Sequence, residues 1–280
     1  MALPARLTVG ADGRDNGARL WPRTHALPER FDVLRSRRPL PGLVNIALDH
    51  AVAASVGSGA RPASVRIWNW EETLVVIGSS QSLSNEVDTE AARRRGVLVA
   101  RRTSGGGTMF MDPIRAITYS VILPTQVLDG LSLRESYAMC DSWVLDALRG
   151  LGVPAFYRPI NDIATDEGKV GGAAQRRLAS GVTVHHATMS WEIDTSMLME
   201  VTRLFRPDTG ARGTKSAQKK VVGVRDYADV TRDEVIDAMI AEISRGRRVR
   251  TGTYRPGELL EAEKLVRERL ATGRWLAKIP

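Results

Sequence analysis

The order of strand-like and helix-like segments constrains the fold of this chain more than any other feature. Two short β-rich runs, residues 63–70 and 73–78, are separated only by the polar pair Glu71-Glu72, which predicts a hairpin. Later segments mix further strands with helices and do not follow the strict strand–helix–strand rhythm of a doubly wound sheet. We therefore expect an α+β fold with a mixed, mainly antiparallel sheet flanked by helices.

Helical periodicity is clearest over residues 132–152, where Ser132 and Glu135 form a capping box and Cys140 lies on the apolar face. Residues 45–57 have the apolar spacing of a helix that ends at a glycine. Further helices are predicted over residues 196–205, 231–245 and 258–270. After the helix of residues 132–152, β-like segments are predicted at residues 155–158, 161–165, 169–175 and 181–193.

Composition divides the chain into three parts. Residues 1–30 are rich in Gly, Pro, Arg and Asp without apolar periodicity, and we expect a flexible N-terminal extension there. Residues 31–250 are predicted to form one catalytic domain, and residues 251–280 a C-terminal helical tail. The whole chain is 43% apolar and 26% charged, which is typical of a soluble globular protein.

Charge and cysteine content limit the function classes. The formal charge is +8, but no zinc-finger, helix-turn-helix or RNP-like pattern accompanies the basic residues, so nucleic acid is not the expected partner. No apolar run approaches the roughly 20 residues that span a bilayer, and the N-terminus lacks an apolar signal region, so no membrane partner is expected either. The single cysteine, Cys140, suits a reducing compartment, and we expect a cytoplasmic protein.

A glycine triplet follows the predicted strand at residues 97–102. Three successive glycines let the backbone approach a ligand closely, and their N–H groups can face an anion beside Arg102. The loop is not a P-loop, because no Gly-Lys-Ser/Thr follows and no helix opens there. The plainer alternative is a glycine-rich hairpin loop.

The segment of residues 161–177 places Lys169 among glycines. A lysine held there could neutralise a phosphate and a carboxylate together, as the activation of an acid by ATP demands. The alternative is a solvated turn lysine, which is the commonest fate of this residue type.

Two adjacent histidines, His185 and His186, lie on a predicted strand. Their side chains point to opposite faces, which argues against both binding one metal ion. We expect one to line a pocket and the other to pack. Cys140 is expected to be a small buried hydrophobe, because a nucleophilic cysteine needs exposure and a basic neighbourhood.

Taken together and in this order, the segments resemble the lipoate–protein ligase A family, within the biotin and lipoate ligase superfamily. The resemblance spans about residues 31–230 and implies a catalytic domain like those of class II aminoacyl-tRNA synthetases and biotin ligases. It is carried by NIALDHAV near residue 45, VVIGSSQSLSNEVD with Gly78, Gln81 and Glu86, RRTSGGGTMFMD, NDI–GKVGGAAQRR, GVTVHHATM and TKSAQKKVVGVRDYADV.

This resemblance implies a chemistry and a set of partners. Lipoate or octanoate would react with ATP, with Mg²⁺, to give the acyl adenylate, and the acyl group would pass to a lysine of a lipoyl carrier domain. The usual carriers are the glycine-cleavage H protein and the acyltransferase subunits of 2-oxoacid dehydrogenases. Some relatives supply an accessory domain as a separate protein, so a missing partner is part of the expectation.

The resemblance also implies site residues. Lys169 would contact both the acyl carbonyl and the phosphate. Asn161 and Asp162 would face the nucleotide, with Asp162 as the magnesium ligand, and His186 would line the acyl tunnel. The remaining implied members of the acyl and adenylate pocket are Arg102, Ser104, Gly105, Gly106, Gly107 and Gly171.

Two other functions stay open. An ATP-independent octanoyl or lipoyl transferase of the same superfamily would form a thioester on a cysteine near the pocket, and residues 161–169 contain none; a transferase that works without its own cysteine is also open. A non-catalytic paralogue that binds the acyl chain or the carrier is favoured by Met111 and Ala187, which stand where the family often has histidine and glycine. The intact Lys169 opposes it.

Overall fold

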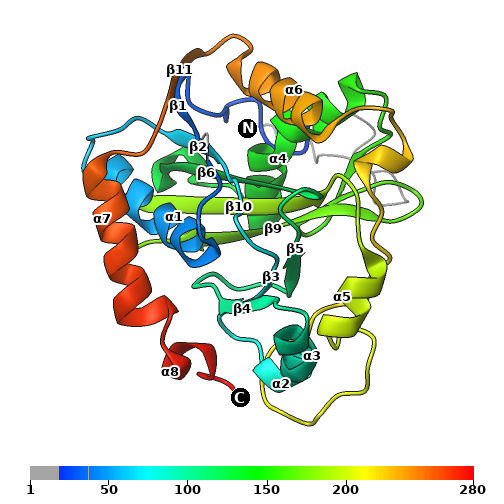
Figure 1. Ribbon diagram of the computed structural model, residues 1–280. Helices are drawn as coiled ribbons and strands as arrows, with labels where there is room; N and C mark the ends of the chain where they lie inside the picture. Colours follow the sequence, from blue (N-terminus) through cyan, green and yellow to red (C-terminus); the bar gives the residue numbers. More distant parts are fainter. Residues whose placement is uncertain (1–18, 37) are drawn as a thin grey trace.

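The computed structural model describes residues 19–36 and 38–280, so most of the predicted N-terminal extension lies outside the described residues. An eight-stranded sheet runs through the centre, parallel between β11, β1 and β2 and antiparallel from β2 onwards (Figure 1). The predicted α+β fold with a mainly antiparallel sheet is confirmed. In sheet order the strands are β11 (Arg248–Gly252), β1 (Arg30–Arg35), β2 (Ser64–Ile67), β6 (Ala116–Pro124), β10 (Val182–Ser190), β9 (Lys169–Arg177), β8 (Asp162–Ala164) and β7 (Phe156–Arg158).

Helices cover both faces of this sheet. Helices α4 (Leu133–Gly150) and α6 (Arg232–Ser244) pack on one face, and α1 (Gly42–Gly57) and α7 (Pro256–Leu265) on the other (Figure 1). Strand β6 shows why: Tyr119 and Val121 pack toward α4, whereas Ile122, which points the opposite way, packs toward α1. Each face therefore has its own hydrophobic core. No helix among the described residues combines the length and apolar character needed to cross a membrane.

The helix boundaries follow local sequence signals. Both predicted capping boxes form, Ser132 with Glu135 at the start of α4 and Thr231 with Glu234 at the start of α6. Helix α1 ends at Gly57, as its sequence pattern predicts. Two short 3₁₀ helices, η1 (Thr125–Leu128) and η2 (Val224–Asp226), lie between these elements. A π-helical segment, η3 (Val266–Leu270), directly follows α7.

A smaller three-stranded sheet lies beside the main one, in the lower part of Figure 1. The predicted hairpin between residues 63–70 and 73–78 is wrong, because β2 and β3 belong to different sheets. Strand β2 already has β1 and β6 on its two edges, so the next run must pair elsewhere. The small sheet has the order β4 (Leu98–Arg101), β3 (Leu74–Ile77), β5 (Met109–Met111), and short helices surround it: α2 (Leu83–Glu86), α3 (Thr89–Arg94), α5 (Thr195–Val201) and α8 (Gly273–Leu276).

The glycine loop, residues 105–107, closes against the end of β3. A Cβ atom on Gly78 would lie 2.2 Å from the carbonyl oxygen of Gly106, so only glycine allows this approach. Gly106 itself has φ +88°, which is in the left-handed region that favours glycine. The position of the loop therefore depends on glycines in two separate segments.

Both ends of the described chain are packed. Leu20 and Leu27 are buried in the core beneath α4. At the other end, the predicted boundary at residue 250 falls inside β11, and the buried Arg101 donates to the carbonyls of Leu276 (2.8 Å) and Ile279 (3.0 Å). Residues 276–279 thus bind the end of β4, one strand of the small sheet.

A buried ion-pair cluster ties β1 to α7. The guanidinium of Arg61 lies 3.0 Å from Asp32 and 2.5 Å from Glu258, and all three side chains are almost fully buried. Burial alone would raise the pKa of Glu258, but the hydrogen bonds from Arg61 and from the Arg255 N–H outweigh it and lower that pKa. The cluster is therefore ionised in the folded protein.

Replacing Arg61 with methionine should destabilise the protein strongly. The buried carboxylate of Glu258 would lose its partner, which typically costs about 3–5 kcal/mol of unfolding free energy. The exposed Arg93, paired with Glu90 on the surface, supplies the control, because Arg93→Met should leave the free energy of unfolding nearly unchanged. Urea unfolding measures both, and equal effects would contradict the assignment.

The pH dependence gives a second check on Arg61. A carboxylate whose folded pKa is lowered contributes stability above its unfolded pKa, about 4.3 for glutamate, and loses it as the pH falls through the folded value. In Arg61→Met, Glu258 can take up a proton and so escape its unpaired burial. The difference between wild type and variant should therefore shrink as the pH falls from 7 toward 4.

Replacing Gly78 with alanine should displace the glycine loop. The new Cβ would collide with a backbone carbonyl, and overpacking of this kind costs about 1–3 kcal/mol. Gly105 is the matched control, because a Cβ there meets no atom within 4 Å and Gly105→Ala should be nearly neutral. Thermal unfolding distinguishes the two, and a neutral Gly78→Ala would show that the contact is not needed.

Candidate active site

A cleft of about 310 Å³ opens between the two sheets. Its walls are the glycine loop with β5, the starts of β9 and of β8, and residues 214–222, a segment that we call the arm. Gly106, Gly107, Asn161, Asp162, Lys169 and Gly171 line it, so six of the predicted site residues meet in one place. A second hollow of about 250 Å³, beside Leu20 and Arg149, contains none of them.

Asp162 lies between two lysines at the bottom of this cleft. Its carboxylate is 1% exposed, and the ammonium nitrogen of Lys169 lies 2.9 Å from Oδ1. This ion pair lacks the geometry of a hydrogen bond, whereas Lys219 from the arm donates a hydrogen bond to Oδ2. Lys169 is therefore held at Asp162 by charge and not by a hydrogen bond.

The glycine pair in β9 makes the space in which Lys169 lies. A Cβ on Gly172 would be 2.3 Å from the Lys169 Nζ, and a Cβ on Gly171 would be 2.7 Å from the Met189 Cγ. Asn161 fixes the entry to β8, because its Nδ2 donates to the Ala173 carbonyl at 2.6 Å. Any side chain at residue 172 would push Lys169 away from Asp162.

The charge lining the cleft is unbalanced. Among the described residues, three lysines, Lys169, Lys215 and Lys219, line it together with one carboxylate, Asp162. Lys215 is also ion-paired with Asp208 at 3.6 Å, so the unbalanced charge lies at Lys169 and Lys219, which share Asp162. A concave site with excess positive charge and glycine backbone attracts an anionic ligand. The site is therefore suited to phosphate or carboxylate groups.

Arg102 shapes the glycine loop from behind. Its Nη2 donates to the carbonyls of Gly105 (2.6 Å) and Gly107 (2.8 Å), and its Nε donates to Ser104 Oγ (3.1 Å). Burial lowers the pKa of Arg102 to about 10, which still leaves the guanidinium charged at neutral pH. The carbonyls of Gly105 and Gly107 point toward Arg102, and Gly106 and Gly107 line the cleft on the other side of the loop.

A small apolar chamber of about 20 Å³ adjoins the cleft at Met109 and Thr188. Trp68 and Trp70 form part of its wall, and His186 and Arg102 lie at its polar side. The chamber can accept only an apolar group, and only if its walls move. Methionine side chains are among the most adaptable wall residues, and the chamber has two, Met109 and Met111.

A hydrogen-bonded chain lies behind the chamber. His186 Nε2 is 2.8 Å from Ser104 Oγ, and His186 Nδ1 is 2.9 Å from Asp49 Oδ2. Burial lowers the pKa of His186 although Asp49 opposes this, so the ring is neutral at neutral pH. The Nδ1–H therefore donates to Asp49, and Nε2 accepts from Ser104.

His185 lies on the other face of β10, as predicted from the alternation along a strand. It is fully buried, and its Nε2 lies 2.6 Å from the Asp141 carboxylate. Tyr119 also donates to Asp141, at 2.5 Å. His185 thus packs beneath α4, whereas His186 lines the chamber.

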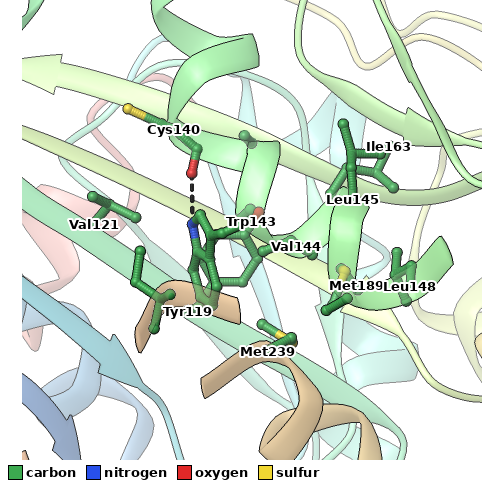
Figure 2. Packing of buried hydrophobic residues seen from close by; sticks show 14 of the residues in the cluster. Tyr119, Val121, Cys140, Trp143, Val144, Leu145, Leu148, Ile163, Met189 and Met239 are labelled. Atoms are coloured by element: carbon green, nitrogen blue, oxygen red, sulfur yellow. Dashed lines mark hydrogen bonds between the residues drawn. The ribbon is translucent and has the colours of Figure 1, made fainter. Parts of the chain in front are cut away.

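Cys140 is remote from the cleft. It lies in the core between α4 and the sheet, and its carbonyl accepts a hydrogen bond from Trp143 (Figure 2). Burial, and then the neighbouring Asp141, raise the pKa of its thiol, so the thiolate is disfavoured. Since the chamber lies on the α1 face, the sheet separates Cys140 from it.

One polar cluster joins the cleft walls and was not predicted as a unit. The buried carboxylate of Glu86 accepts hydrogen bonds from Ser216 N–H (2.8 Å), Ser216 Oγ (2.5 Å) and Thr108 Oγ1 (2.6 Å). Ser216 Oγ in turn accepts from the Thr108 N–H (2.7 Å) and from Gln81 (2.9 Å). The cluster links α2 and the turn before it to Thr108, which follows the glycine loop, and to the arm.

The described residues contain no group of three or more His, Cys, Asp or Glu side chains placed to hold a metal ion. At Asp162, the predicted magnesium ligand, both carboxylate oxygens already face lysines. These residues do not fit a magnesium site built by the protein alone.

Comparison with known protein families gives a match over most of the chain. Residues 41–244 match the family described as the lipoyl protein ligase A/B catalytic domain. This range contains the glycine loop, both histidines, Lys169 and the whole arm.

Two relatives with different activities are equally similar to this chain. Lipoate-protein ligase A subunit 1 of Thermoplasma acidophilum is 29% identical over 246 residues, which cover 83% of this chain and 90% of the relative. Octanoyltransferase LipM of Symbiobacterium thermophilum is 29% identical over 259 residues, which cover 84% of this chain and 92% of the relative. Both relatives are named as enzymes, the first as a ligase and the second as a transferase.

Two solved structures share the fold over nearly their full length. A bi-partite lipoate protein ligase of T. acidophilum, studied with its E2 lipoyl domain, is 27% identical with a TM-score of 0.73, covering 88% of this chain and 94% of that one. A lipoate-protein ligase A bound with ATP is 26% identical with a TM-score of 0.72, covering 89% and 98%. The chain therefore belongs to the lipoyl protein ligase A/B catalytic domain family.

Proposed function

We propose that the protein is a lipoate–protein ligase that activates lipoate or octanoate with ATP and transfers the acyl group to a lysine of a lipoyl carrier domain. The observation that carries this proposal is the position of Lys169. It lies in a positively charged cleft that adjoins an apolar chamber. A fatty acid presents both an apolar chain and an anionic end, and ATP supplies a polyphosphate, so the two substrates match the two parts of the site.

The proposed reaction has two steps. A carboxylate oxygen of the acid attacks the α-phosphorus of ATP, and the bond from that phosphorus to pyrophosphate breaks. The carrier amine then attacks the acyl carbonyl, loses a proton, and the bond to AMP breaks. Both steps develop negative charge on oxygen, which Lys169 can stabilise from its place between the glycine pair and Asp162.

The other site residues bind and orient. The chamber would take the acyl chain, with Met109 and Met111 moving to admit it. Asp162 keeps Lys169 and Lys219 near the cleft floor, and Arg102 holds the loop in which Gly105–Gly107 lie. Magnesium is in keeping with this proposal as an ion carried by the ATP phosphates, a common mode of binding for this cation.

The structure of the region around Cys140 supports the ligase over a cysteine-dependent transferase. The chain has one cysteine, and it is buried across the sheet from the chamber with a raised pKa. An acyl chain bound in the chamber would have no thiolate to react with. The thioester route therefore lacks its nucleophile.

A second candidate is an octanoyltransferase, and the equal similarity to octanoyltransferase LipM favours it. The acyl group would then pass from an activated donor to the carrier lysine without a protein thioester. In this case the cleft would bind the donor in place of ATP, and Lys169 would stabilise the tetrahedral intermediate.

Partners follow from the same relatives. The T. acidophilum ligase is bi-partite and was studied with its E2 lipoyl domain. The T. acidophilum protein that is 29% identical to this chain is named subunit 1 of lipoate-protein ligase A. We accordingly include in the proposal a lipoyl carrier domain as acyl acceptor and a separate accessory protein that assists the activation step. A reducing, cytoplasmic setting agrees with the single buried thiol.

Incubation with a lipoyl carrier domain, magnesium and octanoate or lipoate should acylate the carrier only when ATP is present. Intact mass of the carrier measures the product. Lys169→Ala should lower the rate by about 10²–10³-fold, the usual effect of losing one charge-stabilising donor. Cys140→Ala should retain activity, because the buried thiol takes no part.

The outcomes separate the candidates. Acylation from an acyl thioester but not from free acid and ATP would establish the transferase and sink the ligase. A folded Cys140→Ala variant without activity would restore the thioester route. Acylation from preformed acyl adenylate alone would indicate that activation needs the accessory protein, and a lack of product from every donor would leave only the binding paralogue.

A further inference from the structure

We propose that Lys219 is a second phosphate-binding residue of this site, delivered by the arm to act opposite Lys169. The inference rests on the proposed use of ATP for its substrate, but the geometry that carries it stands alone. Lys219 reaches from the arm into the cleft and donates to the carboxylate that Lys169 also faces.

The arm is fixed on both sides of Lys219. Upstream, the Thr214 N–H donates to the Ser80 carbonyl at 2.9 Å, and Ser216 is bound to Glu86 through both its N–H and its hydroxyl. Downstream, the arm runs beside β9: the Lys169 N–H donates to the Lys220 carbonyl, and the Val222 N–H donates to the Lys169 carbonyl, each at 2.9 Å. The backbone at residue 219 therefore has a defined position above the cleft floor.

Backbone pairing also links the two lysines directly. Lys169 and Val221 form a parallel bridge, so the start of β9 and the end of the arm cannot shift independently. Asp162 on β8 then receives one ammonium group from each segment. The three residues form one assembly that spans three segments of the chain.

The excess positive charge of this assembly suits it to bind a polyphosphate. One carboxylate, Asp162, cannot neutralise the two ammonium groups of Lys169 and Lys219, so this assembly carries a net positive charge. Asp162 therefore offsets their positive charge only in part, and the pair still attracts a further anion. A polyphosphate supplies several negative oxygens, so both lysines can turn to it while Asp162 keeps them oriented.

The neighbouring residue supplies a matched control. Both lysines are exposed to solvent, but Lys219 lines the cleft and donates to Asp162, whereas Lys220 is not among the residues that line the cleft. Its link to Lys169 is made by its backbone carbonyl, which alanine retains. Lys219→Ala and Lys220→Ala thus remove the same charge from adjacent positions, one inside the cleft and one outside.

Calorimetric titration with ATP, with and without magnesium, tests the assignment in the full-length protein. Lys219→Ala should weaken ATP binding by at least tenfold, whereas Lys220→Ala should stay within about twofold of wild type, because a charged contact within the site exceeds general attraction. Lys219→Arg should recover most of the affinity. Octanoate binding should be unchanged in all three variants, and thermal unfolding should confirm that they fold.

Kinetics give an independent measurement in the presence of the carrier domain. Lys219→Ala should raise the KM for ATP more than it lowers kcat and should leave transfer from preformed acyl adenylate less affected than the overall reaction. Lys169→Ala should impair both steps. This contrast separates a phosphate ligand from a residue that only supports the fold.

Each outcome bears on one of the two proposals. Unchanged ATP binding in Lys219→Ala, or equal losses in Lys219→Ala and Lys220→Ala, would overturn the role of Lys219 while leaving the ligase intact. Binding that is lost in Lys219→Ala, in a protein that acylates no carrier, would support the phosphate site and sink the ligase. Absence of ATP binding by wild type would overturn both.

Discussion

The buried carboxylate of Asp49 is the interaction on which the two halves of the site depend. It comes from α1, binds the guanidinium of Arg66 from β2, and accepts hydrogen bonds from Ser120 on β6 (2.7 Å) and from His186 on β10. Burial would raise its pKa, but Arg66 above all lowers it, so the charge persists inside the protein. Through His186 and Ser104 this one charge reaches the glycine loop, and the helix, the sheet and the loop are fixed together.

The site separates two tasks that a single pocket would perform poorly. Apolar burial stabilises a hydrocarbon chain without directing it, whereas charge directs an anion but loses strength in water. Here the tryptophan-lined chamber and the lysine-lined cleft adjoin at Met109 and Thr188. An acid bound as proposed would have its chain and its carboxylate in different surroundings, with the reactive end at the boundary.

Local sequence signals predicted much of this structure, and the parts they missed depend on long-range contacts. Capping boxes, the glycine that ends α1 and the alternation of His185 and His186 act within a few residues, and each was predicted correctly. The hairpin prediction failed because a strand's partner depends on which edges of the sheet are already filled. Asp49 and Ser216 were missed as site residues because a polar residue's partner can lie more than a hundred positions away; a carboxylate on the apolar stripe of α1 was the available signal.

The parallel pairing of β1 with β11 has a consequence for how the chain folds as it is synthesised. Residues 30–34 pair with residues 248–252, so one edge of β1 stays open until β11, more than two hundred residues later, has left the ribosome. Phe31 and Val33 lie on β1 and are fully buried in the folded protein. An unpaired apolar edge is a site for mispairing between nascent chains. Stalled or truncated translation products of this protein should therefore be the forms that most require chaperones.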